Sequence, residues 1–100
     1  MGKGKSGEKV ECLNPNTGGS ININKDIYDL FVKGIKDSLK NGKSLTYTEL
    51  VEGIENYFRS NKIVFNKSIS WYAVAVKHDL DVKGIIKVYT EKGKKLHKQA

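Results

Sequence analysis

The chain has 100 residues, of which 38% are hydrophobic and 29% are charged, and its formal net charge at pH 7 is +7. This length supports one domain, and no apolar run approaches the roughly 20 residues that a transmembrane helix needs. The first residues lack the apolar core of a signal peptide, so we expect a cytoplasmic protein with no membrane contact. Cys12 is the single cysteine, which excludes an internal disulfide.

The positive charge is concentrated near the two ends of the chain. Residues 1–9 contain three lysines and one glutamate, a net charge of +2, and residues 83–98 contain six lysines and one glutamate, a net charge of +5. All other residues together are therefore neutral, since these two segments already give the total of +7. This segregation favours contact with a polyanion, although lysines also serve as solvated residues that protect sheet edges.

The N-terminal quarter of the chain predicts a tail and a hairpin. Residues 1–9 are mostly glycine, lysine and serine, so we expect a disordered basic tail before a winged-helix domain over residues 10–100. Two short apolar segments, residues 10–13 and 21–23, flank residues 14–19, where proline, asparagine and glycine favour a turn. This pattern indicates an N-terminal β-hairpin.

A first helix is predicted over residues 25–41. Asn24 or Asp26 can cap its start, and Asn41-Gly42 is a stop signal. Apolar residues then recur with the spacing of one helical face. The predicted buried positions are Tyr28, Phe31, Val32, Ile35 and Leu39.

A second helix is predicted over residues 46–59. Thr46 and Glu49 have the spacing of a capping box, in which each side chain binds the backbone N–H of the other residue. Gly34 and Gly53 fall inside the two predicted helices, where glycine costs up to about 1 kcal/mol relative to alanine. We therefore expect another helix to pass close to these two positions.

A third helix and a second hairpin complete the chain. Residues 60–67 form a connection that holds a loop or a short strand, and Ser68 is a suitable N-cap for a helix over residues 68–83. Its predicted core positions are Ile69, Ala73, Val76 and Leu80. Residues 85–98 then read as a β-branched strand, a turn at Gly93 and a lysine-rich return strand. The whole order predicts an α+β winged helix-turn-helix, with three helices, a C-terminal β-hairpin wing and an additional N-terminal β-hairpin.

Four sequence motifs extend over most of the chain. They are N-P-N-T-G-G at 14–19, L-T-x-x-E-L at 45–50, S-x-x-W-Y at 68–72 and V-K-x-D-L-x-x-K-G-x-I at 76–86. In these motifs and their spacing the chain resembles a family of small, functionally uncharacterised bacterial proteins, each of which looks like a single winged-helix domain. The resemblance implies a fold and no activity, because that family has no established function. The wing here is richer in lysine than the pattern requires.

Residues suited to catalysis are scarce. His78 and His97 are the only histidines, and no H-x-x-x-H, C-x-x-C or G-x-S-x-G arrangement is present. Asp79 and Asp81 are two positions apart, which directs them to different sides of a helix. Cys12 and the two histidines are scattered, so a metal site would need three distant residues to meet. We expect a non-enzymatic protein with no cofactor, no metal and no small-molecule substrate.

Duplex DNA is the partner that the charge pattern and the predicted fold favour. In this interpretation the N-terminal end of the third helix approaches the major groove and the wing lysines bind phosphates. The candidate contacts are Lys67, Ser68, Ser70, Lys77, Lys92, Lys94 and Lys95. Arg59 is the only arginine, so we expect backbone contacts rather than bidentate recognition of guanine. Such a module could regulate transcription.

A protein-interaction or dimerisation module is the alternative. Opposite its core positions the third helix carries a second apolar face made of Trp71, Val74, Ala75, His78 and Val82. This face lacks the polar side chains that recognise base edges, and its apolar area should be covered by something. The two candidates are the N-terminal hairpin and a second copy of the chain in a homodimer. We expect His78 to be a core or interface histidine.

Overall fold

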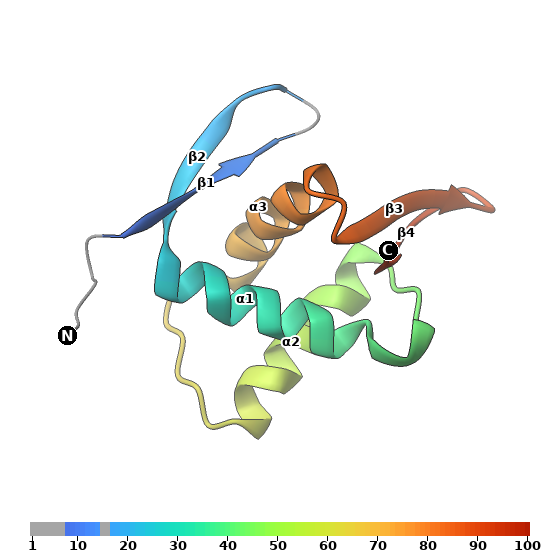
Figure 1. The fold of residues 1–100 in the computed structure, drawn as a ribbon. Helices are drawn as coiled ribbons and strands as arrows, with labels where there is room; N and C mark the ends of the chain where they lie inside the picture. The colour runs from blue at the N-terminus through green and yellow to red at the C-terminus, as the bar shows by residue number, and fades with distance from the viewer. Residues whose placement is uncertain (1–7, 15–16) are drawn as a thin grey trace.

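The structure is a computed structural model of the 100-residue chain and describes residues 8–14 and 17–100 (Figure 1). In chain order its elements are β1 (Lys9–Leu13), β2 (Ser20–Asn24), α1 (Lys25–Ser38), the 3₁₀ turn η2 (Lys40–Gly42), α2 (Tyr47–Ser60), α3 (Ile69–Val82), β3 (Ile86–Glu91) and β4 (Lys94–Gln99). The predicted α+β fold with three helices and two hairpins is confirmed. The predicted tail lies mostly outside the described residues, as do the turn residues Pro15 and Asn16, and Lys9 already belongs to β1.

All three helices begin where their capping residues predict. The side chain of Asn24 accepts a hydrogen bond from the backbone of α1. Thr46 and Glu49 form the expected capping box, with the Thr46 backbone N–H donating to Glu49 Oε1 over 2.9 Å. Ser68 Oγ accepts from the backbone N–H of Trp71 over 3.2 Å. These contacts are local, and they fix the helix starts independently of the tertiary fold.

The end of α1 differs from its prediction. The helix was expected to continue to residue 41, but α1 ends at Ser38 and a 3₁₀ turn follows. Within that turn Asn41 adopts φ of 66° and Gly42 adopts φ of 76°. Both values lie in the left-handed region, which an α-helix cannot include. The stop signal was therefore correct, and the helix ends one turn before it.

The core lies between the three helices. Aromatic rings link α1, α2 and the connection before α3, because the Phe31 ring lies 5.2 Å from the rings of both Phe58 and Phe65. The Tyr72 ring of α3 lies 5.4 Å from that of Phe65 in an edge-to-face arrangement, which is favourable for aromatic pairs. The connection thus forms a loop from which two partly buried side chains, Ile63 and Phe65, pack on the core. The fully buried apolar side chains of the core are those of Phe31, Ile35, Leu39, Leu50, Ile54, Ala73, Val76 and Leu80.

Helices α1 and α2 approach closely at the two predicted glycines. A Cβ atom added at Gly53 would lie 2.3 Å from Ser38 Oγ and 2.8 Å from Ser38 Cβ, which is a clash. A Cβ atom at Gly34 would lie 3.4 Å from a methyl carbon of Ile54, which is a tight but ordinary contact. The expectation that a helix passes close to both positions is confirmed. An added Cβ atom has room at Gly34 but not at Gly53.

We expect Gly53→Ala to destabilise the protein and Gly34→Ala to be close to neutral. At Gly53 overpacking should cost roughly 1–3 kcal/mol, against a gain in helix propensity of up to about 1 kcal/mol. At Gly34 the same gain applies, and the neighbouring side chain has to yield by only a few tenths of an ångström. Urea unfolding of the two variants measures the difference. Equal midpoints for both variants would contradict the close approach at Gly53.

The two hairpins lie on different sides of α3. In Figure 1 the β1–β2 hairpin arches over α3, whereas the β3–β4 hairpin extends away from the helices at the right. Each hairpin is a separate two-stranded antiparallel sheet. The β3–β4 hairpin is anchored to the segment before α2 by a pair of backbone hydrogen bonds between Leu45 and His97, of 2.9 and 2.8 Å.

Candidate functional site

The β3–β4 hairpin, called the wing below, ends in a two-residue turn. Lys92 and Gly93 adopt φ of 52° and 79°. Positive φ at both central residues is what a type I′ hairpin turn requires, and it is favourable for glycine, asparagine and aspartate. Lys92 is therefore a lysine in a position where its backbone conformation is disfavoured. Its side chain is exposed at the tip of the wing.

The wing has an inner face that packs on the protein and an outer face, from which the Tyr89 hydroxyl still reaches Ser44 Oγ over 2.7 Å. The cross-strand pairs of the outer face are Lys87 with Lys98, Tyr89 with Leu96, and Glu91 with Lys94. The pairs of the inner face are Ile86 with Gln99, Val88 with His97, and Thr90 with Lys95. Ile86 and His97 are buried, which identifies the inner face. The five wing lysines, used below as one set, are Lys87, Lys92, Lys94, Lys95 and Lys98.

At the N-terminal end of α3 the predicted contacts are exposed. Lys67, Ser68 and Ser70 all lie on the surface, and the hydroxyl groups of the two serines are 3.2 Å apart. Lys77 requires a correction, because the helical spacing placed it on an exposed flank whereas only 5% of its surface is exposed. Its Nζ lies 5.9 Å from the centre of the Tyr47 ring, and burial lowers its pKa. The first residue of α2 covers this flank, which the sequence of α3 could not show.

His97 is a buried histidine that ties the wing to the helices. It is fully buried, and its Nδ1 lies 2.9 Å from the carbonyl oxygen of Leu45. Its Nε2 is the buried side-chain nitrogen that lacks a hydrogen-bond partner among the described residues. Burial lowers the pKa of His97, the Leu45 carbonyl acts in the opposite direction, and the positive charges of Lys77 and Lys95 lower the pKa further.

Acidification should therefore weaken the protein through His97. The neutral ring stabilises the fold fully above the ordinary histidine pKa of about 6.5, and this contribution is lost as the pH falls from there towards the lower folded-state pKa. Each pH unit should cost up to about 1.4 kcal/mol. Urea midpoints between pH 8 and 5.5 measure the slope, and His97→Leu should flatten it more than His78→Gln does. Equal slopes in wild type and His97→Leu would refute this role.

A buried aspartate holds the β1–β2 hairpin against α3. Asp79 is fully buried and accepts hydrogen bonds from the Leu13 backbone N–H over 3.1 Å and from the Tyr28 hydroxyl over 2.6 Å. Lys83 Nζ lies 2.7 Å from the same carboxylate. Burial alone would raise the pKa of Asp79, but these hydrogen bonds outweigh it and the pKa is lowered. For Tyr28, burial and the bond to Asp79 raise the pKa to about 12.

Sequence reasoning missed Asp79. From the sequence it is only one of two carboxylates on the same helix, and no structural partner is predicted for it. One signal was available, because Lys83 follows Asp79 at the i,i+4 spacing of a helical ion pair. The partners Leu13 and Tyr28 are 66 and 51 residues away in the sequence, so no local pattern connects them with Asp79.

The hairpin covers only part of the second apolar face of α3. Cys12 of β1 is buried, and burial raises the pKa of its thiol to about 11. Ala75 and His78 are half-buried, whereas Trp71 remains 52% exposed and Val82 44% exposed. The predicted cover by the N-terminal hairpin is therefore partial.

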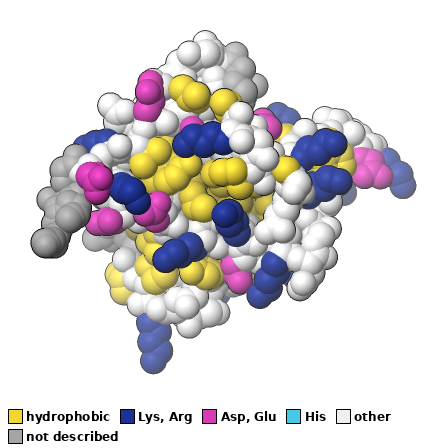
Figure 2. Space-filling model, in the orientation of Figure 1, with side chains coloured by type: hydrophobic (Ala, Val, Ile, Leu, Met, Phe, Trp, Pro, Cys, Tyr) yellow, Lys and Arg dark blue, Asp and Glu magenta, His cyan; other side chains and the backbone are white. Residues whose placement is uncertain are grey.

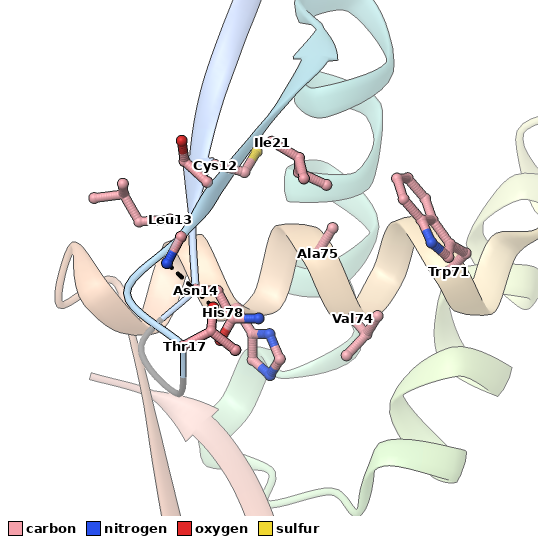
Figure 3. Close-up of a pocket in the computed structure, with 11 residues that line it drawn as sticks. Cys12, Leu13, Asn14, Thr17, Ile21, Trp71, Val74, Ala75 and His78 are labelled. Carbon is pink, nitrogen blue, oxygen red and sulfur yellow. Dashed lines mark hydrogen bonds between the residues drawn. The ribbon is translucent and has the colours of Figure 1, made fainter.

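Between the hairpin and α3 lies a pocket of about 340 Å³ (Figure 3). The residues of α3 that line it are Trp71, Val74, Ala75 and His78. The residues from the hairpin are Cys12, Leu13, Asn14, Thr17, Gly19, Ser20 and Ile21. Four of the five residues predicted as an interface thus line a cavity.

In residues 8–14 and 17–100 no three or more His, Cys, Asp or Glu side chains come together in a way that could hold a metal ion. Within the same ranges, no helix has the length and apolar character needed to cross a membrane.

Comparison with known proteins finds one family. The model of a family of unknown function, DUF6958, matches residues 9–96, from the first residue of β1 into β4. The match thus includes all three helices, the pocket and most of the wing. No curated protein and no solved structure matches the chain significantly.

Proposed function

The chain belongs to the DUF6958 family, whose function is unknown, and from its surface we propose that it is a non-enzymatic module that binds duplex DNA. The wing lysines bind phosphates, and the N-terminal end of α3 approaches the duplex beside them. The arrangement of three helices followed by a basic hairpin supports the assignment as a winged-helix protein. This role agrees with the cytoplasmic location expected from the sequence, and it could serve transcriptional regulation. A bacterial origin is proposed from the resemblance of the sequence motifs alone.

One observation carries the proposal: the wing places like charges directly opposite each other. Lys87 and Lys98 are cross-strand partners on the outer face, an arrangement that destabilises an isolated hairpin. Lys92 holds a third positive charge at the tip in a disfavoured backbone conformation. Figure 2 shows several dark-blue lysine or arginine side chains at the right, over the wing. A row of phosphates would neutralise this repulsion.

The N-terminal end of α3 supports the same interpretation. Lys67, Ser68 and Ser70 are exposed there, and the first backbone N–H groups of a helix favour an anion such as phosphate. Since Arg59 is the only arginine and lies in α2, the contacts should be to the DNA backbone rather than to base edges. We therefore propose binding with weak sequence preference.

A second candidate function is a protein-interaction or dimerisation module. The exposure of Trp71 and Val82 favours it, because large apolar side chains on one helix face often mark an interface. In that case the lysines serve solubility alone. The two functions differ in their response to salt, which decides between them.

A titration against duplex DNA at several salt concentrations tests the proposal. Each phosphate contact adds about 0.9 to the slope of log affinity against log salt, so a wing with three to four contacts gives a slope of about 3. Affinity should then fall about 60-fold between 50 and 200 mM salt. Fluorescence anisotropy with a labelled duplex measures it. Absence of binding at low salt would favour the interaction module.

A further inference from the structure

The pocket between the β1–β2 hairpin and α3 plays no part in the proposed DNA contacts. Its volume of about 340 Å³ lies at the lower end of the range typical for small-molecule sites, about 300–1,000 Å³. Its hairpin wall is fixed to α3 by the hydrogen bond from Leu13 to the buried Asp79. The hollow is therefore formed by two elements held in place, as expected for a preformed site.

The two ends of the pocket differ in chemistry. Figure 3 shows Trp71 at one end and His78 with Thr17 towards the other. His78 follows Trp71 by seven positions along the helix, a rise of about 10 Å. Between them lie apolar side chains, including Ala75 of α3 and Ile21 of β2. The pocket is thus long, apolar along its length and polar at one end.

The Trp71 end suits a flat ring. The indole packs edge-to-face on Tyr72, with ring centres 4.9 Å apart and an angle of 80° between the planes. This contact fixes the orientation of Trp71 while half of its surface remains exposed. An aromatic ring binds to such an indole surface more favourably than an aliphatic group of the same size, because the ring can stack on it with an offset or meet it edge-on.

The His78 end suits a hydrogen-bonding group. Burial lowers the pKa of His78, so its imidazole is neutral at pH 7 and offers one donor and one acceptor. Charged groups near it are Lys77, Lys95 and Asp81, so both signs are present. The hydroxyl of Thr17 lies at the same end and accepts a hydrogen bond from the Gly19 N–H over 3.1 Å. A hydroxyl group can match this mixture of donors and acceptors.

We propose that this pocket binds a small planar aromatic molecule with a hydroxyl group at one end, its ring against Trp71 and its hydroxyl at His78. The inference does not depend on DNA binding. A second copy of the chain is a poorer occupant, since a hollow between two walls would stay largely empty under the flat surface of a partner. A small molecule can fill it.

Three probes of similar size separate the two parts of the proposal. 4-Ethylphenol has both the ring and the hydroxyl, ethylbenzene lacks the hydroxyl, and 4-ethylcyclohexanol lacks the planar ring. We expect 4-ethylphenol to bind with a Kd of about 1 mM or tighter, and the other two to bind about three- to tenfold more weakly. NMR titration should show the largest shifts at Ile21, Ala75 and His78 and at the indole N–H of Trp71.

Variants of α3 provide matched controls. Ala75→Phe places a ring inside the pocket and should weaken binding of 4-ethylphenol at least tenfold, whereas Val82→Phe adds the same group outside the pocket and should leave it unchanged. Ala75→Leu replaces the first variant if that one fails to fold. His78→Phe should bring the affinities for 4-ethylphenol and ethylbenzene to within about twofold of each other.

Four results would overturn the proposal. Shifts spread over the whole surface, or equal affinity for all three probes, would mean that the pocket does not select this class of molecule. Unchanged binding in both Ala75 variants would place the ligand elsewhere. If sedimentation shows a dimer, and if 4-ethylphenol causes the same NMR shifts as dilution of the protein, then the second apolar face of α3 binds a second copy of the chain. None of these results bears on the salt-dependent titration with DNA, so the two proposals fail separately.

Discussion

Replacing Lys92, Lys94 and Lys95 together by glutamate abolishes binding to duplex DNA and leaves the fold intact. The three side chains are exposed at and beside the tip of the wing, so the substitutions should change the free energy of unfolding only slightly. Three phosphate contacts are lost and three like-charge repulsions replace them. We expect affinity at 50 mM salt to fall by at least about 100-fold. Anisotropy titration measures the affinity, and thermal unfolding checks the fold.

The control carries the same change in net charge at another place. Lys33 and Lys36 lie exposed on α1 and Lys43 lies exposed after it, so replacing these three by glutamate also removes six units of charge. This variant should lose only a few-fold in affinity, through the general electrostatic field. If both triple variants lose binding equally, net charge rather than the wing supplies the affinity. If neither does, the wing is not the DNA contact.

Asp79→Ala should have the largest effect on stability. It removes the carboxylate that Leu13, Tyr28 and Lys83 share. The Leu13 N–H and the Tyr28 hydroxyl then lose their acceptor in the interior of the protein. Hydrogen bonds to a charged group contribute about 1.5–3 kcal/mol each, and Lys83 can return to solvent because its side chain is 41% exposed. We expect a loss of about 3 kcal/mol, which lowers Tm by roughly 12–24 °C.

Asp81→Ala is the matched control. It removes a carboxylate from the same helix, two residues away on a half-buried position, and should change stability by less than about 0.5 kcal/mol. Asp79→Ala should also loosen the β1–β2 hairpin, which limited proteolysis detects as early cleavage near β2. Equal stability of the two variants would mean that the hairpin is held by apolar contacts alone.

The Asp79 contribution also has a pH dependence of known sign. Because the folded-state pKa of Asp79 lies below its ordinary value of 3.8, its stabilisation is present above that value and is lost as the pH falls through the lower folded-state pKa. Wild type should accordingly lose stability below about pH 4 more steeply than Asp79→Ala.

The sequence by itself determined the local structure. Ser68, Thr46 and Glu49 predicted their helix starts, since a capping contact joins residues no more than three positions apart. The β-branched and aromatic residues of β3 predicted the wing, and the spacing of the buried residues of α3 predicted that helix, because both patterns are also local. The concentration of lysine in residues 83–98 required no structure at all.

Only the tertiary structure decided which side chains of these elements are available. Lys77 is buried because Tyr47 of another helix covers it, and Asp79 and His97 are fixed by partners 66, 51 and 52 residues away. The pocket likewise exists because the hydrogen bond from Leu13 to Asp79 holds the hairpin on α3 while Trp71 remains half-exposed. The periodicity of a helix or strand predicts on which face of that element a side chain lies. Whether that face is buried depends on which other parts of the chain pack against it.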